Sequence, residues 1–378
     1  MARLALIMLL SAWLSGCASV AYVGQAARGQ AEVLNKARPI AELIADPTTP
    51  EPLRSKLRFA QRVRAFAIAE LGLPDNASYT RYTDLGRPHA LWSVVSTPPL
   101  SLSPVQSCFP LAGCLSYRGY YQQADARDYA AQRRALGEDV YEYGIPAYST
   151  LGWFEDPLLN TTVRYDEATL ARLIFHELAH QRVYVRDDSA FNEAFATAVE
   201  LEGYEHWLAS EAQPEAMAAY RRSEQRRQDF RALILSGRTA LAELYASAQP
   251  DADKLVAKQR IQQGLAEQYA ALKTRYGGYI GYDSWFDPLP NNAHLASVAT
   301  YHERVPAFRA LFRQSGSFAA FYAAVEALAQ KNRAARDEAL AALGASVFSG
   351  ENQQGLISND QVLPRQPIVP DGSSMTTE

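Results

Sequence analysis

Basic stretches are largely missing from this sequence. Its 37 Lys and Arg residues are outnumbered by 41 Asp and Glu residues, which gives a formal net charge of −4. Without a concentrated positive surface, nucleic acid is not an expected partner. Internal repeats are absent too, which argues against a repeat architecture. The 378 residues are 48% hydrophobic, an ordinary globular share that can bury one large core or two modest ones.

Long hydrophobic runs are scarce, and the N-terminal one is short. Arg3 precedes the mostly apolar segment Leu4 to Leu14, which is too short to span a bilayer well and is typical of a secretory signal. Residues 14–17 (LSGC) resemble the lipobox of bacterial lipoproteins. This resemblance implies removal of residues 1–16, acylation of Cys17, and anchoring on the periplasmic side of the cell envelope, and Ala18 indicates the outer membrane. The alternative is an ordinary secretory signal with an incidental cysteine.

Cysteine is rare, with three in the whole chain. Beyond Cys17 there remain Cys108 and Cys114, with five residues between them that include Pro110 and Gly113. An oxidising periplasm favours a disulfide between these two cysteines. A two-cysteine zinc site is the rival interpretation.

The most informative stretch is residues 175–181 (FHELAHQ). His176 and His180 are four residues apart, so on a helix they share one face and can reach a single zinc ion. Glu177 lies beside them, as a general base for hydrolysis requires. Residues 167–184 contain no Gly or Pro, and Asp166 is a predicted N-cap, so we expect a helix here. A hydrogen-bonded histidine pair without a metal is the alternative.

A second helix, predicted over residues 190–206, is expected to supply the third metal ligand. A short polar connection makes two helices antiparallel neighbours, which brings Glu193 level with His180. Glu200 lies about 10 Å further along the axis, beside Leu173, so it and Asn192 are predicted to support the ligands instead of binding the metal. The third histidine of the metzincin motif is missing, which argues against that arrangement.

Two other stretches are candidate parts of an active site. Residues 148–154 have β character, and an edge strand there would pair with a peptide substrate through Ser149, Thr150, Leu151 and Gly152, although a core strand is an equal alternative. A hydrolase also needs a donor for the developing oxyanion, for which Tyr301 is the first candidate and His294 and His302 are others. Helix capping by Asn291 and Asn292 is the alternative role of that region.

The rest of the chain predicts a mostly helical α+β protein. We expect a single domain over residues 17–349, a helical insertion at about residues 210–275 and a disordered tail over residues 350–378. The arginines near the start of the insertion are interpreted as its solvated face. Further elements are predicted as helices at residues 20–44, 53–71, 125–136 and 318–343 and as strands at residues 79–85, 90–96 and 117–121.

Four segments together resemble the family of bacterial predicted aminopeptidases, described as zinc-dependent lipoproteins. They are residues 148–157 (YSTLGWFEDP), 175–181 (FHELAHQ), 191–196 (FNEAFA) and 291–295 (NNAHL). The resemblance implies a zincin-like metallopeptidase that holds Zn²⁺ through His176, His180 and Glu193, with Glu177 in the catalytic position. The gap between His180 and Glu193 is shorter than in thermolysin-like enzymes.

Two questions of function stay open at this level. An exopeptidase needs a carboxylate that binds the free amine of its peptide substrate, for which Glu155 and Glu200 are candidates. An envelope lipoprotein that binds zinc without catalysing a reaction is the alternative to a peptidase.

Overall fold

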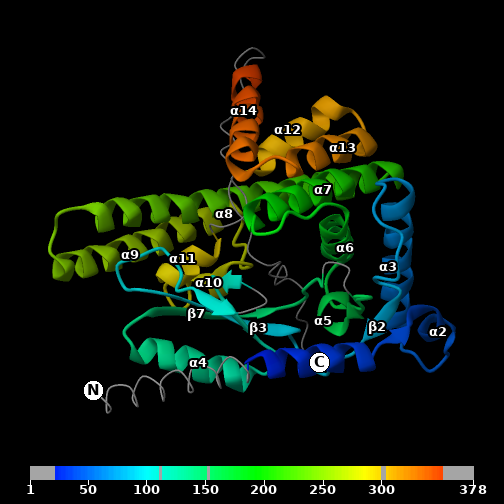
Figure 1. Ribbon diagram of the computed structural model, residues 1–378, viewed down its shortest axis with the longest axis horizontal. Coiled ribbons are helices and arrows are strands. Elements are labelled where there is room, and N and C mark those ends of the chain that lie inside the picture. Colours follow the sequence, from blue (N-terminus) through cyan, green and yellow to red (C-terminus); the bar gives the residue numbers. More distant parts are fainter. Residues whose placement is uncertain (1–21, 110–112, 151–153, 299–303, 352–378) are drawn as a thin grey trace, which may run out of the picture.

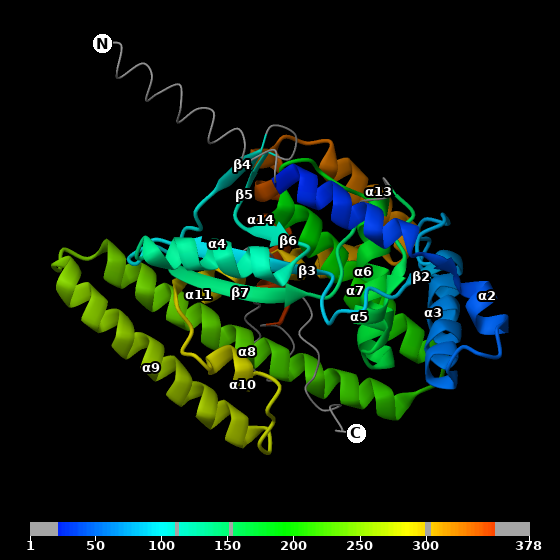
Figure 2. The ribbon, with the colours of Figure 1, turned by 90° about the horizontal axis from the view of Figure 1, so that it is seen from below.

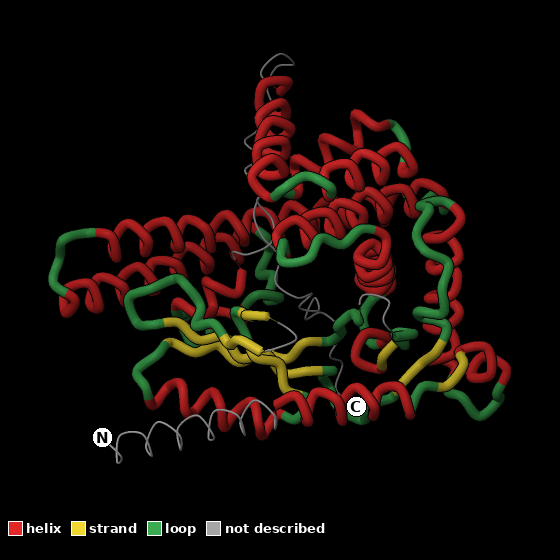
Figure 3. Tube along the Cα trace, viewed as in Figure 1, coloured by secondary structure: helices red, strands yellow, loops and turns green. Residues whose placement is uncertain are grey.

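The computed structural model describes residues 22–109, 113–150, 154–298 and 304–351. Helices dominate the described part and three small sheets complete it, which confirms the mostly helical α+β class (Figures 1 and 3). In this part of the chain, every helix is too short or too polar to cross a bilayer.

A central pair of packed helices organises the molecule. It consists of α6 (Glu167–Arg182) and α7 (Ser189–Ser210) (Figure 1). Helix α3 (Glu51–Ala69) packs against α6, and α12 (Val305–Ser315) packs against α7. Helices α13 (Phe318–Ala329) and α14 (Arg333–Glu351) adjoin α12.

Local sequence explains where the central helices begin. The Asp166 carboxylate accepts a hydrogen bond from Thr169 N at 2.8 Å, which confirms the predicted N-cap of α6. Asp188 caps α7 in the same way, because its carboxylate accepts from Phe191 N. The predicted helix 318–343 is wrong, since Asn332 ends it by capping α14 through Ala335 N and so divides it in two.

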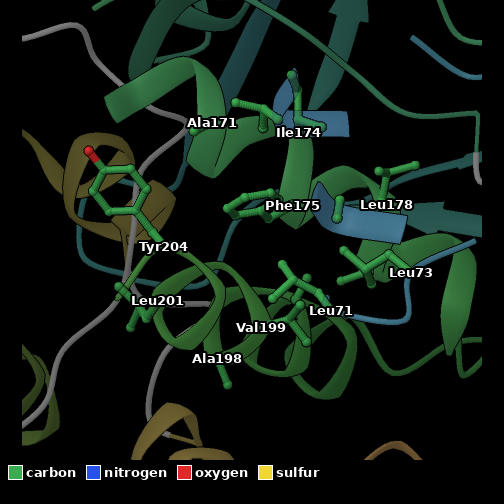
Figure 4. Packing of buried hydrophobic residues seen from close by; sticks show 14 of the residues in the cluster. Leu71, Leu73, Ala171, Ile174, Phe175, Leu178, Ala198, Val199, Leu201 and Tyr204 are labelled. Atoms are coloured by element: carbon green, nitrogen blue, oxygen red, sulfur yellow. The ribbon is translucent and has the colours of Figure 1, made fainter. Parts of the chain in front are cut away.

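The main core lies where α6 meets α7. Phe175 and Leu178 of α6 and Val199 of α7 are completely buried, with Leu71 packed between the helices (Figure 4). Each such side chain contributes about 1.5–3 kcal/mol through burial. Gly203 permits the close approach of α7, because a Cβ there would lie 2.7 Å from Leu71 Cδ1.

A three-stranded antiparallel sheet lies beside the helical core. Its central strand β3 (Leu91–Thr97) pairs with β6 (Arg118–Tyr120) and with β7 (Asp139–Ile145). Helix α4 (Gln123–Ala135) and helix α11 (Asn292–Val298) both pack on β3 and β7, and Figure 1 shows them on opposite faces. Strand β7 is absent from the predictions above.

Smaller elements complete the fold. The second sheet joins β1 to β2 antiparallel and β2 to β8 parallel, and the third is the hairpin β4–β5, in which Cys108 and Cys114 form a disulfide. The bounds of these strands and of the two short helices are β1 (Arg38–Pro39), β2 (Arg81–Thr83), β4 (Ser107–Phe109), β5 (Gly113–Leu115), β8 (Leu158–Leu159), α2 (Ile40–Ala45) and α5 (Asn160–Val163). A further helix covers residues 22–35.

The long helices α8 (Pro214–Ala246) and α9 (Asp251–Arg275) form a hairpin with α10 (Asp283–Phe286) beside it (Figure 2). It shares an apolar cluster with α11 and α10. The prediction that its arginines form a solvated face is wrong for Arg231, which is 8% exposed. Burial lowers the pKa of Arg231 to about 10 against the opposing effect of Glu224. Arg221 and Arg222 are exposed as predicted.

Candidate metal centre

Three side chains from α6 and α7 converge with the spacing of a metal site. Nε2 of His176 lies 3.1 Å from Nε2 of His180. Oxygens of Glu193 lie 3.4 Å from His176 Nε2 and 3.6 Å from His180 Nε2. Donor atoms held at roughly 2.0 to 2.1 Å from a tetrahedral zinc ion are about 3.3 to 3.4 Å apart. The donor set and its spacing therefore fit one zinc ion with a fourth position left for another ligand.

The connection between the two helices brings Glu193 level with the histidines. Asn192 closes it, because its side-chain amide donates to Val185 O and accepts from Val185 N, both at 2.7 Å. Asn192 was expected to support the ligands, and the contacts that it makes are with this connection. The carboxylate of Asp188 also accepts from Arg336 at 2.8 Å and from Arg304 at 3.2 Å, which ties the start of α7 to α14.

Glu200 contacts His176, one of the three candidate ligands, at the ring nitrogen opposite Glu193. Its Oε2 lies 3.1 Å from Nδ1 of His176, and its Oε1 lies 2.8 Å from Nη2 of Arg172. A ring that donates through Nδ1 keeps Nε2 free as a ligand atom. Glu200 therefore lies nearer to the cluster than its expected place beside Leu173. Nδ1 of His180, in contrast, is buried without a partner in the described part of the chain.

Burial and charge set the protonation of the cluster. Burial lowers the pKa of His180 to about 4, so this ring is neutral at neutral pH, as a metal ligand must be. Burial also opposes the charged form of His176, but the carboxylates of Glu193 and Glu200 outweigh it and raise the pKa of His176 well above its usual value. The pKa of Glu193 is lowered, because the two histidines outweigh the effect of burial.

Glu177 has the environment of a proton acceptor. Its burial raises the pKa of the carboxyl group to about 7, and Glu193 and Asp156 act in the same direction against His176. This value is close to neutral pH, where a general base works best. The charge of Glu177 also acts on Tyr79, a bulky residue held at a φ of +62°. The sequence carries no signal for Tyr79, because its conformation depends on contacts with other segments.

The predicted substrate segment is partly described. Ser149 and Thr150 lie outside regular secondary structure and contact Asp156, whose carboxylate accepts from Thr150 N at 2.9 Å and Thr150 Oγ1 at 2.7 Å. The predicted strand is therefore wrong for residues 148–150 and for Phe154, which are outside any strand. Leu151 and Gly152 lie outside the described residues. Asp156 is a structural residue that the prediction missed, although the Asp-Pro pair is a turn signal.

Of the three candidates for an oxyanion donor, the structure describes His294. Tyr301 and His302 lie outside the described residues. His294 is buried, stacks on Tyr141 at 3.9 Å between ring centroids, and has its pKa lowered by burial to about 3. Asn291 caps α11 through Ala293 N and His294 N, so the capping alternative is confirmed for this residue.

The two candidates for binding a free amine also differ. Glu200 is completely buried and already paired with Arg172 and His176, so it cannot bind a substrate amine. Glu155 is exposed. Cys17 and the signal segment lie outside the described residues.

A comparison with protein families gives a match over most of the chain. The model of the family described as "putative aminopeptidase" matches residues 21–340, a range that includes His176, Glu177, His180 and Glu193. No curated protein and no solved structure matches the chain.

Proposed function

The chain belongs to that aminopeptidase family, and from this premise we propose that it is a zinc-dependent peptidase with a zincin-like active site. Family membership supports a peptidase in general. The observation that carries the dependence on zinc is the spacing of the donor atoms of His176, His180 and Glu193, which matches tetrahedral zinc coordination.

The residues of the site divide the work of hydrolysis. His176, His180 and Glu193 would hold the ion and leave a position open to substrate and water. Zinc supplies Lewis acidity toward a peptide carbonyl group and a water molecule. Glu177 takes a proton from the attacking water and delivers it to the leaving amine. Its pKa of about 7, raised by burial, suits both transfers.

Replacement of Glu177 tests this mechanism. Glu177→Gln keeps the size of the side chain but cannot accept a proton, so we expect zinc to stay bound while peptide hydrolysis falls at least about 100-fold. The measurements are zinc content by elemental analysis and hydrolysis of a peptide library by mass spectrometry. Glu167→Gln, an exposed change at the start of the same helix, is the control.

The same experiment separates the alternative function. A chain that binds zinc but cleaves no peptide in its wild-type form would be a zinc-binding lipoprotein. Full turnover by Glu177→Gln would exclude Glu177 as the base. The product map also decides between release of single N-terminal residues and internal cleavage.

We further propose that Cys17 is acylated and that its acyl chains anchor the protein to the envelope membrane. Cys17→Ala should release the protein into the soluble periplasmic fraction, since stable anchoring needs the acyl chains. Fractionation followed by mass spectrometry of the mature N-terminus measures this. Cys17→Ala protein that remains in the membrane fraction would contradict the proposal.

A further inference from the structure

A series of charged side chains in contact leads from the three candidate metal ligands to helix α8. His176 and Arg172 lie one turn apart on α6, and Glu193 and Glu200 lie two turns apart on α7. Their contacts alternate between the two helices: Glu193 touches His176, His176 touches Glu200, and Glu200 touches Arg172. The last member of this series is Glu224 of α8, whose Oε1 lies 3.1 Å from Arg172 Nη2.

We propose that Arg172 and Glu224 are positioning residues for the metal centre, because they hold the Glu200 carboxylate in the place where it orients the His176 ring. The inference rests on the proposed zinc site. It assigns to α8, which contributes no ligand, a part in determining how tightly the ion is held.

Two residues of α8 contact Arg172. The carboxylate of Glu224 pairs with its guanidinium group, and the ring of Tyr220, one turn earlier on α8, lies 5.6 Å from the guanidinium carbon. Arg172 is 7% exposed and Glu200 is 0% exposed. Nη2 of Arg172 contacts both carboxylates, so the buried guanidinium group is held between Glu200 and Glu224 and has little freedom to move. Arg172 therefore links α8 to Glu200 by direct contacts, so the position of α8 affects the position of the Glu200 carboxylate.

Glu200 in turn determines which nitrogen of His176 faces the ion. A histidine ligand is oriented by the partner of its other ring nitrogen, and loss of such a partner typically weakens metal binding by about 10- to 100-fold. Nδ1 of His180 has no such partner in the described part of the chain. The orientation of the pair of histidines therefore depends on the contact between His176 and Glu200. It also depends on Arg172, which holds the Glu200 carboxylate in place.

Zinc affinity of the full-length chain tests the proposal. We would measure it by competition with a chromophoric chelator at neutral pH. Glu224→Gln should weaken zinc binding by about 3- to 10-fold, and Arg172→Met by about 10- to 100-fold. The matched control is Glu202→Gln. Glu202 is also on α7, but its carboxylate pairs with Arg309 of α12 at 2.6 Å instead of with the charges that lead to His176, so its replacement should change affinity less than about 2-fold.

A double-mutant cycle shows whether the effect passes through Glu200. In a Glu200→Gln background, Glu224→Gln should weaken zinc binding no further, because the contact that it supports is already lost. If Arg172→Met does not fold, Glu224→Gln and this cycle decide.

Three results would overturn the proposal. They are wild-type zinc affinity in Glu224→Gln, an undiminished effect of Glu224→Gln in the Glu200→Gln background, and an equal loss in Glu202→Gln. A wild-type chain that binds no zinc would overturn the proposed function as well. Tight zinc binding by the wild type with unaffected variants would overturn the positioning role alone.

Discussion

Asp187 and Asp188 show how much the surroundings of a residue matter. These neighbours have the same side chain, and both are close to an arginine. The pair Asp187–Arg186 is 90% and 87% exposed, whereas the pair Asp188–Arg336 is 1% and 8% exposed. Exposed ion pairs contribute little to stability, but removal of one member of a buried pair leaves an uncompensated charge.

Replacement of the two arginines measures this difference. Arg336→Met should lower the free energy of unfolding by about 3 kcal/mol, since the buried Asp188 carboxylate then loses one of the two arginine partners that it has in the described part of the chain. Arg186→Met should change it by less than about 0.5 kcal/mol. Urea unfolding of both variants gives the comparison, and equal effects would contradict the role assigned to burial.

The connection between α6 and α7 is the decisive element for the site. Only six residues, 183–188, separate the helices, and the turn at Asp187 has a φ of +61°. Asn192 holds this connection through both polar groups of Val185. The level of Glu193 relative to the histidines therefore depends in part on the amide side chain one position before it.

Variants of Asn192 test this dependence. Asn192→Ala removes the acceptor of Val185 N and leaves Val185 O with the bond from Asp188 N at 3.3 Å, which should cost about 2 kcal/mol of stability and weaken zinc binding. Asn192→Asp retains the acceptor for Val185 N but places a carboxylate against Val185 O, so we expect a loss of stability here too. Urea unfolding and chelator competition are the measurements. Wild-type zinc affinity in a folded Asn192→Ala protein would show that the connection does not position Glu193.

The free energy of unfolding of the whole molecule should decrease at low pH, because buried carboxylates become protonated. Burial disfavours ionised Glu224, but Arg172, Arg227 and Arg231 outweigh it and lower the pKa to about 2. A carboxyl group whose pKa is lowered by folding stabilises the protein above its unfolded value of about 4.3, and this contribution is lost as the pH falls through the folded value.

The free energy of unfolding of the zinc-free chain should therefore fall between about pH 4.5 and pH 2. Glu224 alone accounts for roughly 3 kcal/mol of that fall. In Glu224→Gln the stability at neutral pH should be lower and its decrease with acid less steep. Thermal unfolding across this pH range measures both, and an unchanged acid dependence in the variant would contradict the assignment.

Local patterns in the sequence determined the helices of the site and the level of Glu193. The reason is that helix period, capping at Asp166 and the length of a connection act over a few residues. The same reasoning placed β3, β6 and α4 close to their observed bounds.

Tertiary structure alone decided which charged side chains are buried and paired. Arg172, Glu200 and Glu224 are separated by 28 and 24 residues, and on an isolated helix each resembles a solvated surface residue. Likewise, Thr150 bonds to the Asp156 carboxylate, and residues 149–150 do not form the strand that their composition predicts. Burial and long-range pairing depend on which segments meet in space, so a pattern read along the chain does not contain them.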